Sequence, residues 1–249
     1  MRAPPQIFAP ARRRAAQRRA AQRSGSEGAA EFLWRDIAED FRERLDFIRF
    51  EPKRALVIGP DAGLADWLAA RSAEVDRLTL GERDEESPLP RSDYDLVASI
   101  GGLDTVNDLP GALIHLRETL APGGLLLASF PGSGSLPALR HALLAADGER
   151  PAARMHPMVD TRGASGLMER TGFARQVVDS RTIEVTYRAF DRLVGDLRDM
   201  GLTNVLASAP PSLGRVGLER ARQAFAEQSD SAGRVLENFE VLTLTGWKA

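Results

Sequence analysis

The chain has 249 residues, of which 43% are hydrophobic and 27% charged, a composition that excludes a disordered protein and suits one large globular core. It contains no cysteine, which excludes disulfides, thiolate metal sites and a cysteine nucleophile, and its three histidines lack metal-ligand spacing, so we expect no metal site. The formal net charge is −2 although residues 1–24 contain seven arginines and no acid. The remainder is therefore acidic, which argues against specific nucleic-acid binding, and no apolar run is long enough for a transmembrane segment.

The basic N-terminal stretch is distinct from the rest of the chain. We expect residues 1–28 to form a basic arm and residues 29–249 to form one domain. The composition of the arm, rich in Ala, Arg and Gln, is typical of a solvated helix. Docking to an acidic protein, to RNA or to an anionic membrane, or service as a transit peptide, are the alternatives. Because no apolar signal core is evident, we expect a cytoplasmic protein.

In the first half, helical and extended patterns alternate. Apolar residues at spacings of three and four predict a helix over 29–49, and Pro52 ends the pattern. Strands are then expected at 55–59, 77–81, 94–100 and 125–130, with helices at 64–71 and 108–120, a polar loop at 82–93 and a stop signal at 121–124. This alternation predicts an α/β fold with a doubly wound, mostly parallel sheet.

The second half continues this pattern without an internal repeat. Helices are expected at 134–146, 165–173, 189–201 and 215–228, a strand or hairpin at 174–186, and a last strand at 237–247. Gly172 and Gly201 stand where a glycine commonly ends a helix.

Ligands of an open parallel sheet bind beyond the carboxyl ends of its strands. Three strand ends are therefore candidate sites: Gly59–Gly63, Gly81–Glu86 and Ser99–Asn107. The first is a glycine-bounded turn before a helix, where the backbone can approach a ligand closely and the helix N-terminus favours a negative group. An ordinary tight turn is the alternative, because two glycines four residues apart occur in many folds.

Several longer segments resemble a known family. LVIGPDAG, YDLVASI and LAPGGLLLASF are similar to the Rossmann-like S-adenosylmethionine-dependent methyltransferases. VNDLPGAL (106–113), TIEVTY, DLRDMGLTN and the terminal FEVLTLTGW narrow the resemblance to the subfamily that includes complex I assembly factor 5 and the biotin-pathway malonyl-acyl-carrier methyltransferase. The resemblance spans nearly the whole chain and implies S-adenosylmethionine as cofactor and a protein or acyl-carrier substrate.

The first motif departs from the family pattern. Val57 stands where the family has an acid, and Asp61 stands where it has the central glycine of the turn. A side chain at this position would crowd the methionine part of the cofactor, and an acid would repel its carboxylate, although Asp61 could instead pair with the ammonium group. The second half of the family's cofactor site is also shortened, because LTLG runs almost directly into DEESPLP where a helix and a third strand are expected.

The resemblance and the strand ends together define the expected cofactor site. We expect the cofactor to contact Gly59, Asp61, Gly63, Glu82, Asp84, Glu85, Ser99 and Gly101. Of these, Glu82 is the acid nearest to the second strand's end, where a carboxylate would accept from both ribose hydroxyls; a solvated loop acid is the alternative.

The expected reaction site lies beside the third strand. Asp104 and Thr105 stand where the relatives often carry a His–Trp pair, and Asp104 could act as a base. Tyr187 matches a family tyrosine and is the second candidate catalytic residue. Asn107, Arg140 and His156 are candidate substrate residues, and Asn107 and Asp108 could instead cap the next helix. Surface or packing roles are the alternatives for Tyr187, Arg140 and His156.

Three functions remain open from the sequence. The first is an active methyltransferase. The second is a catalytically inactive assembly factor of the complex I type that keeps the fold with a degenerate cofactor site and uses the basic arm for docking to a protein partner. The resemblance also implies arginine hydroxylation for the assembly-factor branch. A nucleotide-binding oxidoreductase is least favoured, because GPDAGL lacks the third glycine of the dinucleotide motif.

Overall fold

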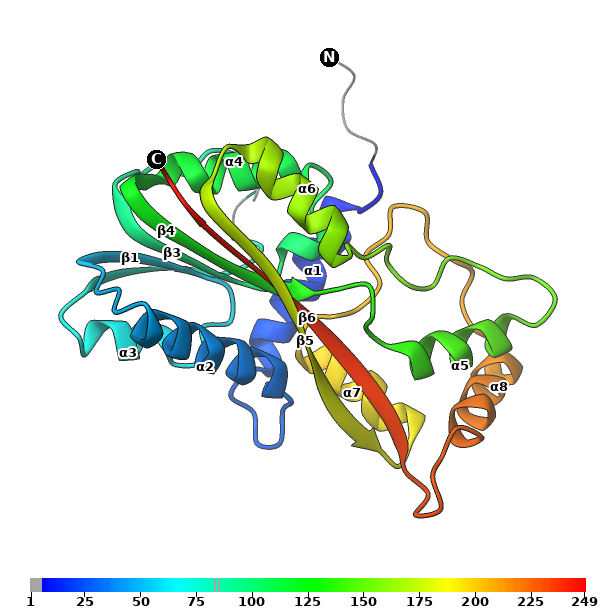
Figure 1. The fold of residues 1–249 in the computed structure, drawn as a ribbon. Helices are drawn as coiled ribbons and strands as arrows, with labels where there is room; N and C mark the ends of the chain where they lie inside the picture. The colour runs from blue at the N-terminus through cyan, green and yellow to red at the C-terminus, as the bar shows by residue number, and fades with distance from the viewer. Residues whose placement is uncertain (1–5, 83, 85) are drawn as a thin grey trace.

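The computed structural model describes residues 6–82, 84 and 86–249. One six-stranded sheet, in the order β2-β1-β3-β4-β6-β5, organises the fold (Figure 1). Its strands are β1 (Arg54–Ile58), β2 (Glu74–Leu78), β3 (Tyr94–Ile100), β4 (Leu120–Pro131), β5 (Ala174–Tyr187) and β6 (Val235–Trp247). The first four are parallel, whereas β6 runs antiparallel to both β4 and β5. The predicted doubly wound, mostly parallel sheet is confirmed.

Helices cover both faces of the sheet. They are α1 (Pro10–Arg23), α2 (Phe32–Phe47), α3 (Leu64–Ala69), α4 (Leu109–Thr119), α5 (Pro137–Asp147), α6 (Thr161–Thr171), α7 (Phe190–Asp199) and α8 (Arg215–Ala226), with a 3₁₀ turn at Leu103–Thr105. Alternate residues of β1 point to opposite faces, as the period of a strand requires. Ala55 and Val57 pack with α2 and α3, whereas Leu56 and Ile58 pack with α4.

The region after β2 is short. Among its described residues, the segment 79–93 forms neither helix nor strand, so β2 is the edge of the sheet. The predicted shortening of the third-strand region is therefore confirmed. The prediction of a strand at 77–81 has the wrong bounds, because the strand is Glu74–Leu78 and the chain leaves the sheet at Thr79. The apolar residues of RLTLG misled the prediction, since Leu80 lines a cavity instead of pairing in the sheet.

Two other boundaries differ from expectation. Residues 121–124, predicted to end a helix outside the sheet, belong to β4, which starts at Leu120 and contains a register shift opposite Tyr94–Leu96. Helix α6 starts four residues earlier than expected, because the side chain of Asp160 accepts from Gly163 N and caps it. The predicted cap of α4 is confirmed, since Asp108 accepts from Gly111 N.

The N-terminal arm is helical, but it is not a fully solvated helix, because one of its faces packs against the domain. Helix α1 lies across the domain and packs against α7 and the 102–107 segment (Figure 1). Ala16 is 3% exposed and belongs to a small cluster with Phe8, Val205 and Leu206. The backbone of Phe8 also forms an antiparallel bridge with Leu206.

Candidate functional site

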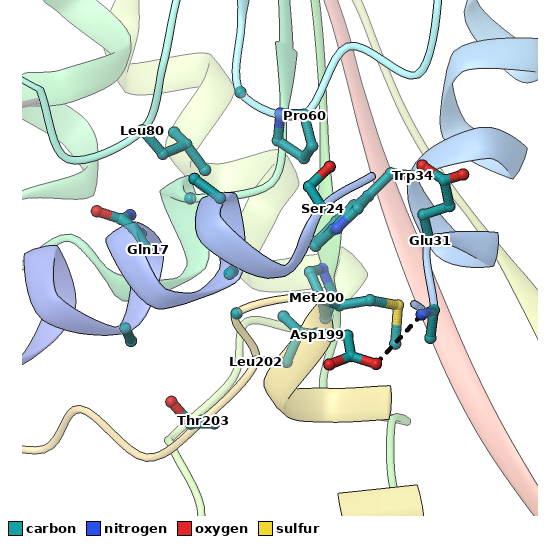
Figure 2. A pocket seen from close by; sticks show the side chains of 18 of the residues that line it. Gln17, Ser24, Glu31, Trp34, Pro60, Leu80, Asp199, Met200, Leu202 and Thr203 are labelled. Carbon is teal, nitrogen blue, oxygen red and sulfur yellow. Dashed lines mark hydrogen bonds between the residues drawn. The ribbon is translucent and has the colours of Figure 1, made fainter. Parts of the chain in front are cut away.

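A cavity of about 700 Å³ opens at the carboxyl ends of β1, β2 and β3. This volume is within the range of ordinary small-molecule sites. The first motif, the end of β2, the turn after β3, helix α1 and the segment after α7 all contribute to its wall. Figure 2 shows ten of the lining residues by name: Gln17, Ser24, Glu31, Trp34, Pro60, Leu80, Asp199, Met200, Leu202 and Thr203.

The predicted glycine turn forms one wall of this cavity. Gly59 has φ +99°, and a Cβ atom built on it would lie 2.1 Å from the Ile100 carbonyl oxygen, so only glycine fits between β1 and β3. Gly63, with φ +81°, precedes α3. The predicted turn is thus present, with Gly59, Pro60, Asp61 and Ala62 lining the cavity.

Asp61 is turned toward its own loop. One carboxylate oxygen accepts from Gly63 N at 2.8 Å, and the other lies 3.2 Å from Arg77 Nε. The Asp61 carboxylate therefore closes the turn through a hydrogen bond at the position where the family has its central glycine. The positive charge of Arg77 offsets its negative charge. Asp61 forms part of the cavity wall and leaves the cavity open beside it.

Of the acids predicted after β2, the two that the structure describes, Glu82 and Asp84, do not line the large cavity. Glu82 is exposed, and its carboxylate accepts from Thr79 N at 3.4 Å. Asp84 lines a separate cavity of about 30 Å³ together with Ser99 and Gly101. Glu85 lies outside the described residues. Thr79 and Leu80, and not these acids, face the large cavity from this side.

Asp104, which the sequence predicts to be a reaction-site residue, lies in the wall of the large cavity. Burial raises the pKa of its carboxyl to about 6, an effect that the positive charge of Arg13 opposes. Arg13 reaches this place from α1, donating to Thr105 Oγ1 at 3.0 Å and to the Gly102 carbonyl at 2.8 Å. A carboxyl group with a pKa near neutrality is suited to accept and release a proton at physiological pH.

His156 lines the same cavity. Its Nε2 accepts from Val205 N at 2.8 Å, and its ring contacts Phe8 edge-on at a centroid distance of 5.3 Å. Burial and the charge of Arg12 lower its pKa to about 4. The imidazole is therefore neutral at physiological pH, with its proton on Nδ1. The structure thus brings Asp104 and His156, which are 52 positions apart, into one cavity wall.

The remaining predicted residues are not in this cavity wall. Asn107 binds the backbone of the arm: its Oδ1 accepts from Ile7 N and Phe8 N, both at 2.8 Å, and its Nδ2 donates to the Phe8 carbonyl. Arg140 is exposed on α5. Tyr187 is 3% exposed at the end of β5, where burial and the nearby Asp196 raise its pKa. Catalytic and substrate roles for these three stay predictions that the cavity does not support.

Sequence reasoning missed the part of the site that comes from the arm and from α2. Arg13, Gln17 and Ser24 line the cavity from the arm, and Trp34 lines it from α2. The arm is held at its far end by Asp199, which accepts from Arg23 Nη1 at 3.0 Å and from Ala30 N at 3.3 Å. The one available signal was the alanine-rich face of the arm, which is small enough for close helix packing.

Comparison with known proteins identifies the family. A profile for methyltransferase domains matches residues 29–177. The chain belongs to this methyltransferase family. Arginine-hydroxylase NDUFAF5, mitochondrial, of Rattus norvegicus is 29% identical over 191 residues, covering 74% of this chain and 56% of that protein. Malonyl-[acyl-carrier protein] O-methyltransferase 1 of Coxiella burnetii is 30% identical over 210 residues, covering 75% and 70% of the two chains.

The fold comparison agrees with the family. A crystal structure from Bacillus halodurans, described as a methyltransferase, superposes with a TM-score of 0.51 at 12% identity, covering 83% of this chain and 97% of that one. The present chain spans little more than half the length of the rat relative. Within the described residues, no helix is long and apolar enough to cross a membrane, and no cluster of His, Asp and Glu side chains could hold a metal ion.

Proposed function

We propose that this protein is an S-adenosylmethionine-dependent methyltransferase that binds its cofactor in the large cavity. The observation that carries the proposal is that this cavity remains open at the three strand ends although the first motif is altered. The Asp61 carboxylate accepts a hydrogen bond from Gly63 N and forms an ion pair with Arg77. In the short 79–93 segment, Thr79 and Leu80 line the cavity. With both departures from the family pattern present, a cavity of about 700 Å³ remains at these strand ends.

The proposed cofactor lies along three strand ends. Its amino-acid part contacts the Gly59–Gly63 turn at the N-terminus of α3, where backbone N–H groups favour a carboxylate. Its nucleoside lies toward Thr79 and Leu80, and its reactive methyl faces the turn at Gly102–Thr105. Methyl transfer mainly requires that an acceptor atom be aligned with the methyl group and its leaving sulfur. Asp104 is the group placed to accept a proton from the acceptor.

We infer an acceptor carried by another protein. One relative is named for methylation of malonyl-[acyl-carrier protein], a group carried by a protein, and another is named an arginine hydroxylase. In this chain the cavity lining includes the apolar side chains of Leu136, Met158, Val205 and Phe239 as well as the neutral His156. Such a wall suits an acyl or aliphatic side chain better than a free charged metabolite.

Single-tryptophan variants test the cofactor site. The chain has three tryptophans, and among the described cavity residues Trp34 is the one that lines the wall. In the W67F/W247F variant, which retains Trp34, we expect S-adenosylhomocysteine to change the fluorescence saturably at micromolar concentration. In the matched W34F/W247F variant, which retains Trp67 on α3, we expect no change. A response from Trp67 alone, or from neither, would contradict the proposed site.

A fold that serves assembly without turnover is the second candidate. It is favoured by one observation: among the described residues, no acid from the segment after β2 lines the large cavity, so the usual carboxylate for the ribose hydroxyls is missing from that wall. Docking to a protein partner through the arm belongs to this candidate, and Arg14, Arg18 and Arg19 are exposed for it. Saturable cofactor binding with transfer of a radiolabelled methyl group to a protein fraction would reject it.

A further inference from the structure

Helix α1 lies against the loop that follows β2. Gly81, with φ +83°, lies directly under this helix: a Cβ atom built on it would be 2.8 Å from Gln17 Oε1 and 3.6 Å from Arg14 Cα. A residue with a Cβ at 81 would displace the Gln17 amide and would be strained by the positive φ. The arm therefore forms the cavity wall at the carboxyl end of β2.

Gln17 carries an unsatisfied polar atom in this wall. Its side chain lines the cavity, and its Oε1 is buried without a hydrogen-bond partner in the described structure. A buried carbonyl oxygen without a partner loses its hydration and gains nothing in return. The oxygen lies against Gly81 and forms no hydrogen bond there in the described structure. A donor supplied by a bound ligand would remove this cost.

The surroundings of Gln17 fit a planar base. Leu80 lines the cavity next to it, and its side chain lies within van der Waals reach of Gly102. Figure 2 shows Gln17 and Leu80 at the same end of the cavity, away from Asp199 and Glu31. In an open α/β sheet this end, beyond β2, receives the nucleoside of a bound nucleotide. An apolar side chain next to one amide group is the combination by which many small-molecule sites hold and orient a ligand.

We propose that Gln17 recognises the adenine base of the cofactor. This inference rests on the proposed function, since it assumes an adenosyl ligand in the large cavity. When the amide turns from Gly81 toward the cavity, Oε1 accepts a hydrogen bond from the exocyclic amino group of adenine and Nε2 donates to the neighbouring ring nitrogen, the pairing by which glutamine selects adenine elsewhere. The N-terminal helix thereby supplies a specificity-determining residue that the segment after β2 does not.

The test compares two ligands that differ only at the base edge. S-Adenosylhomocysteine carries the amino donor, whereas S-inosylhomocysteine carries an oxygen acceptor there. We expect the wild type to bind the adenosyl ligand at least about tenfold more tightly, the effect of one neutral hydrogen bond made or left unsatisfied. Q17M keeps the length and helix propensity of the side chain and is expected to bind both ligands within about twofold of each other.

The control is Q22M, the same substitution at an exposed position of the same helix. It should keep the wild-type preference. The inference fails if the wild type binds S-adenosylhomocysteine but does not distinguish the two ligands, or if Q17M retains the full preference. If the wild type binds neither ligand, the proposed function fails and the inference fails with it.

Discussion

The sharpest prediction concerns Gly59, which lies where β1 passes into the cofactor turn. In the G59A variant the new methyl group would lie 2.1 Å from the Ile100 carbonyl oxygen and 3.2 Å from its carbonyl carbon. Ile100 ends β3, which is paired to both β1 and β4, so its backbone has little freedom to move. The positive φ costs about 1–2 kcal/mol for a residue with a Cβ, and overpacking adds about 1–3 kcal/mol.

We therefore expect G59A to lose about 2–5 kcal/mol of unfolding free energy, a large fraction of the roughly 5–15 kcal/mol typical of a domain. Urea denaturation at constant pH measures this loss. The matched control is G195A in α7, where a Cβ atom meets nothing within 4 Å and the substitution should raise stability by up to about 1 kcal/mol. A loss below about 1 kcal/mol in G59A would refute the argument that the turn is sterically closed to other residues.

Three further predictions follow from the contacts. N107A removes three hydrogen bonds to residues 7 and 8, so trypsin should cut the arm faster than in wild type, while unchanged cleavage would show that the arm is held elsewhere. D147N breaks the ion pair with Arg154, in which the Asp147 side chain is 5% exposed and the Arg154 side chain is 11% exposed. The substitution should lower the free energy of unfolding by about 3 kcal/mol at neutral pH. Because hydrogen bonds from Arg154 lower the pKa of Asp147, this contribution is present above about pH 4 and is lost as the pH falls; a loss independent of pH would contradict it. The contribution of Asp104 to stability has the opposite pH dependence, because burial raises its pKa to about 6. Its protonated form stabilises the fold at low pH, and this contribution is lost as the pH rises through 6. The D104N variant should therefore be more stable than wild type at pH 8 but not at pH 4.

The strands that belong to the sheet centre could be predicted well from the sequence. YDLVASI is strand β3 with its predicted bounds, because a short apolar run flanked by polar residues has few alternatives to a buried parallel strand. The edge strand β2 could not be placed as well. Its sequence EVDRL is half-exposed and carries no apolar period, so the neighbouring RLTLG, which faces the cavity, had the stronger signal.

The site could be predicted only in part, because most of its wall comes from long-range packing. The Gly59–Gly63 turn and Asp104 were identifiable, since each follows a strand end directly along the chain. Glu82 also follows a strand end, but the chain turns at Gly81 and leaves its side chain exposed. The arm gave no periodic apolar signal, because the buried residues of its helix are Arg13 and Ala16, and only the folded structure shows that Gln17 lines the cavity.

Asn107 lies before a helix, as expected from the sequence, but its side chain does not cap that helix. A polar residue before a helix is typical of a cap, and its neighbour Asp108 is the cap of α4. Asn107 instead binds the backbone of residues 7 and 8, a contact separated by about a hundred positions in sequence. No local pattern encodes such a partner, because the arm reaches it only after crossing the carboxyl edge of the sheet.

The central claim, that the cavity beneath helix α1 binds an adenosyl cofactor, is tested most directly by calorimetric titration of the intact protein with S-adenosylhomocysteine. The account predicts one saturable site per chain with micromolar affinity. The absence of any binding heat at millimolar ligand, at two temperatures, would contradict it and would leave a protein that keeps the methyltransferase fold without its cofactor.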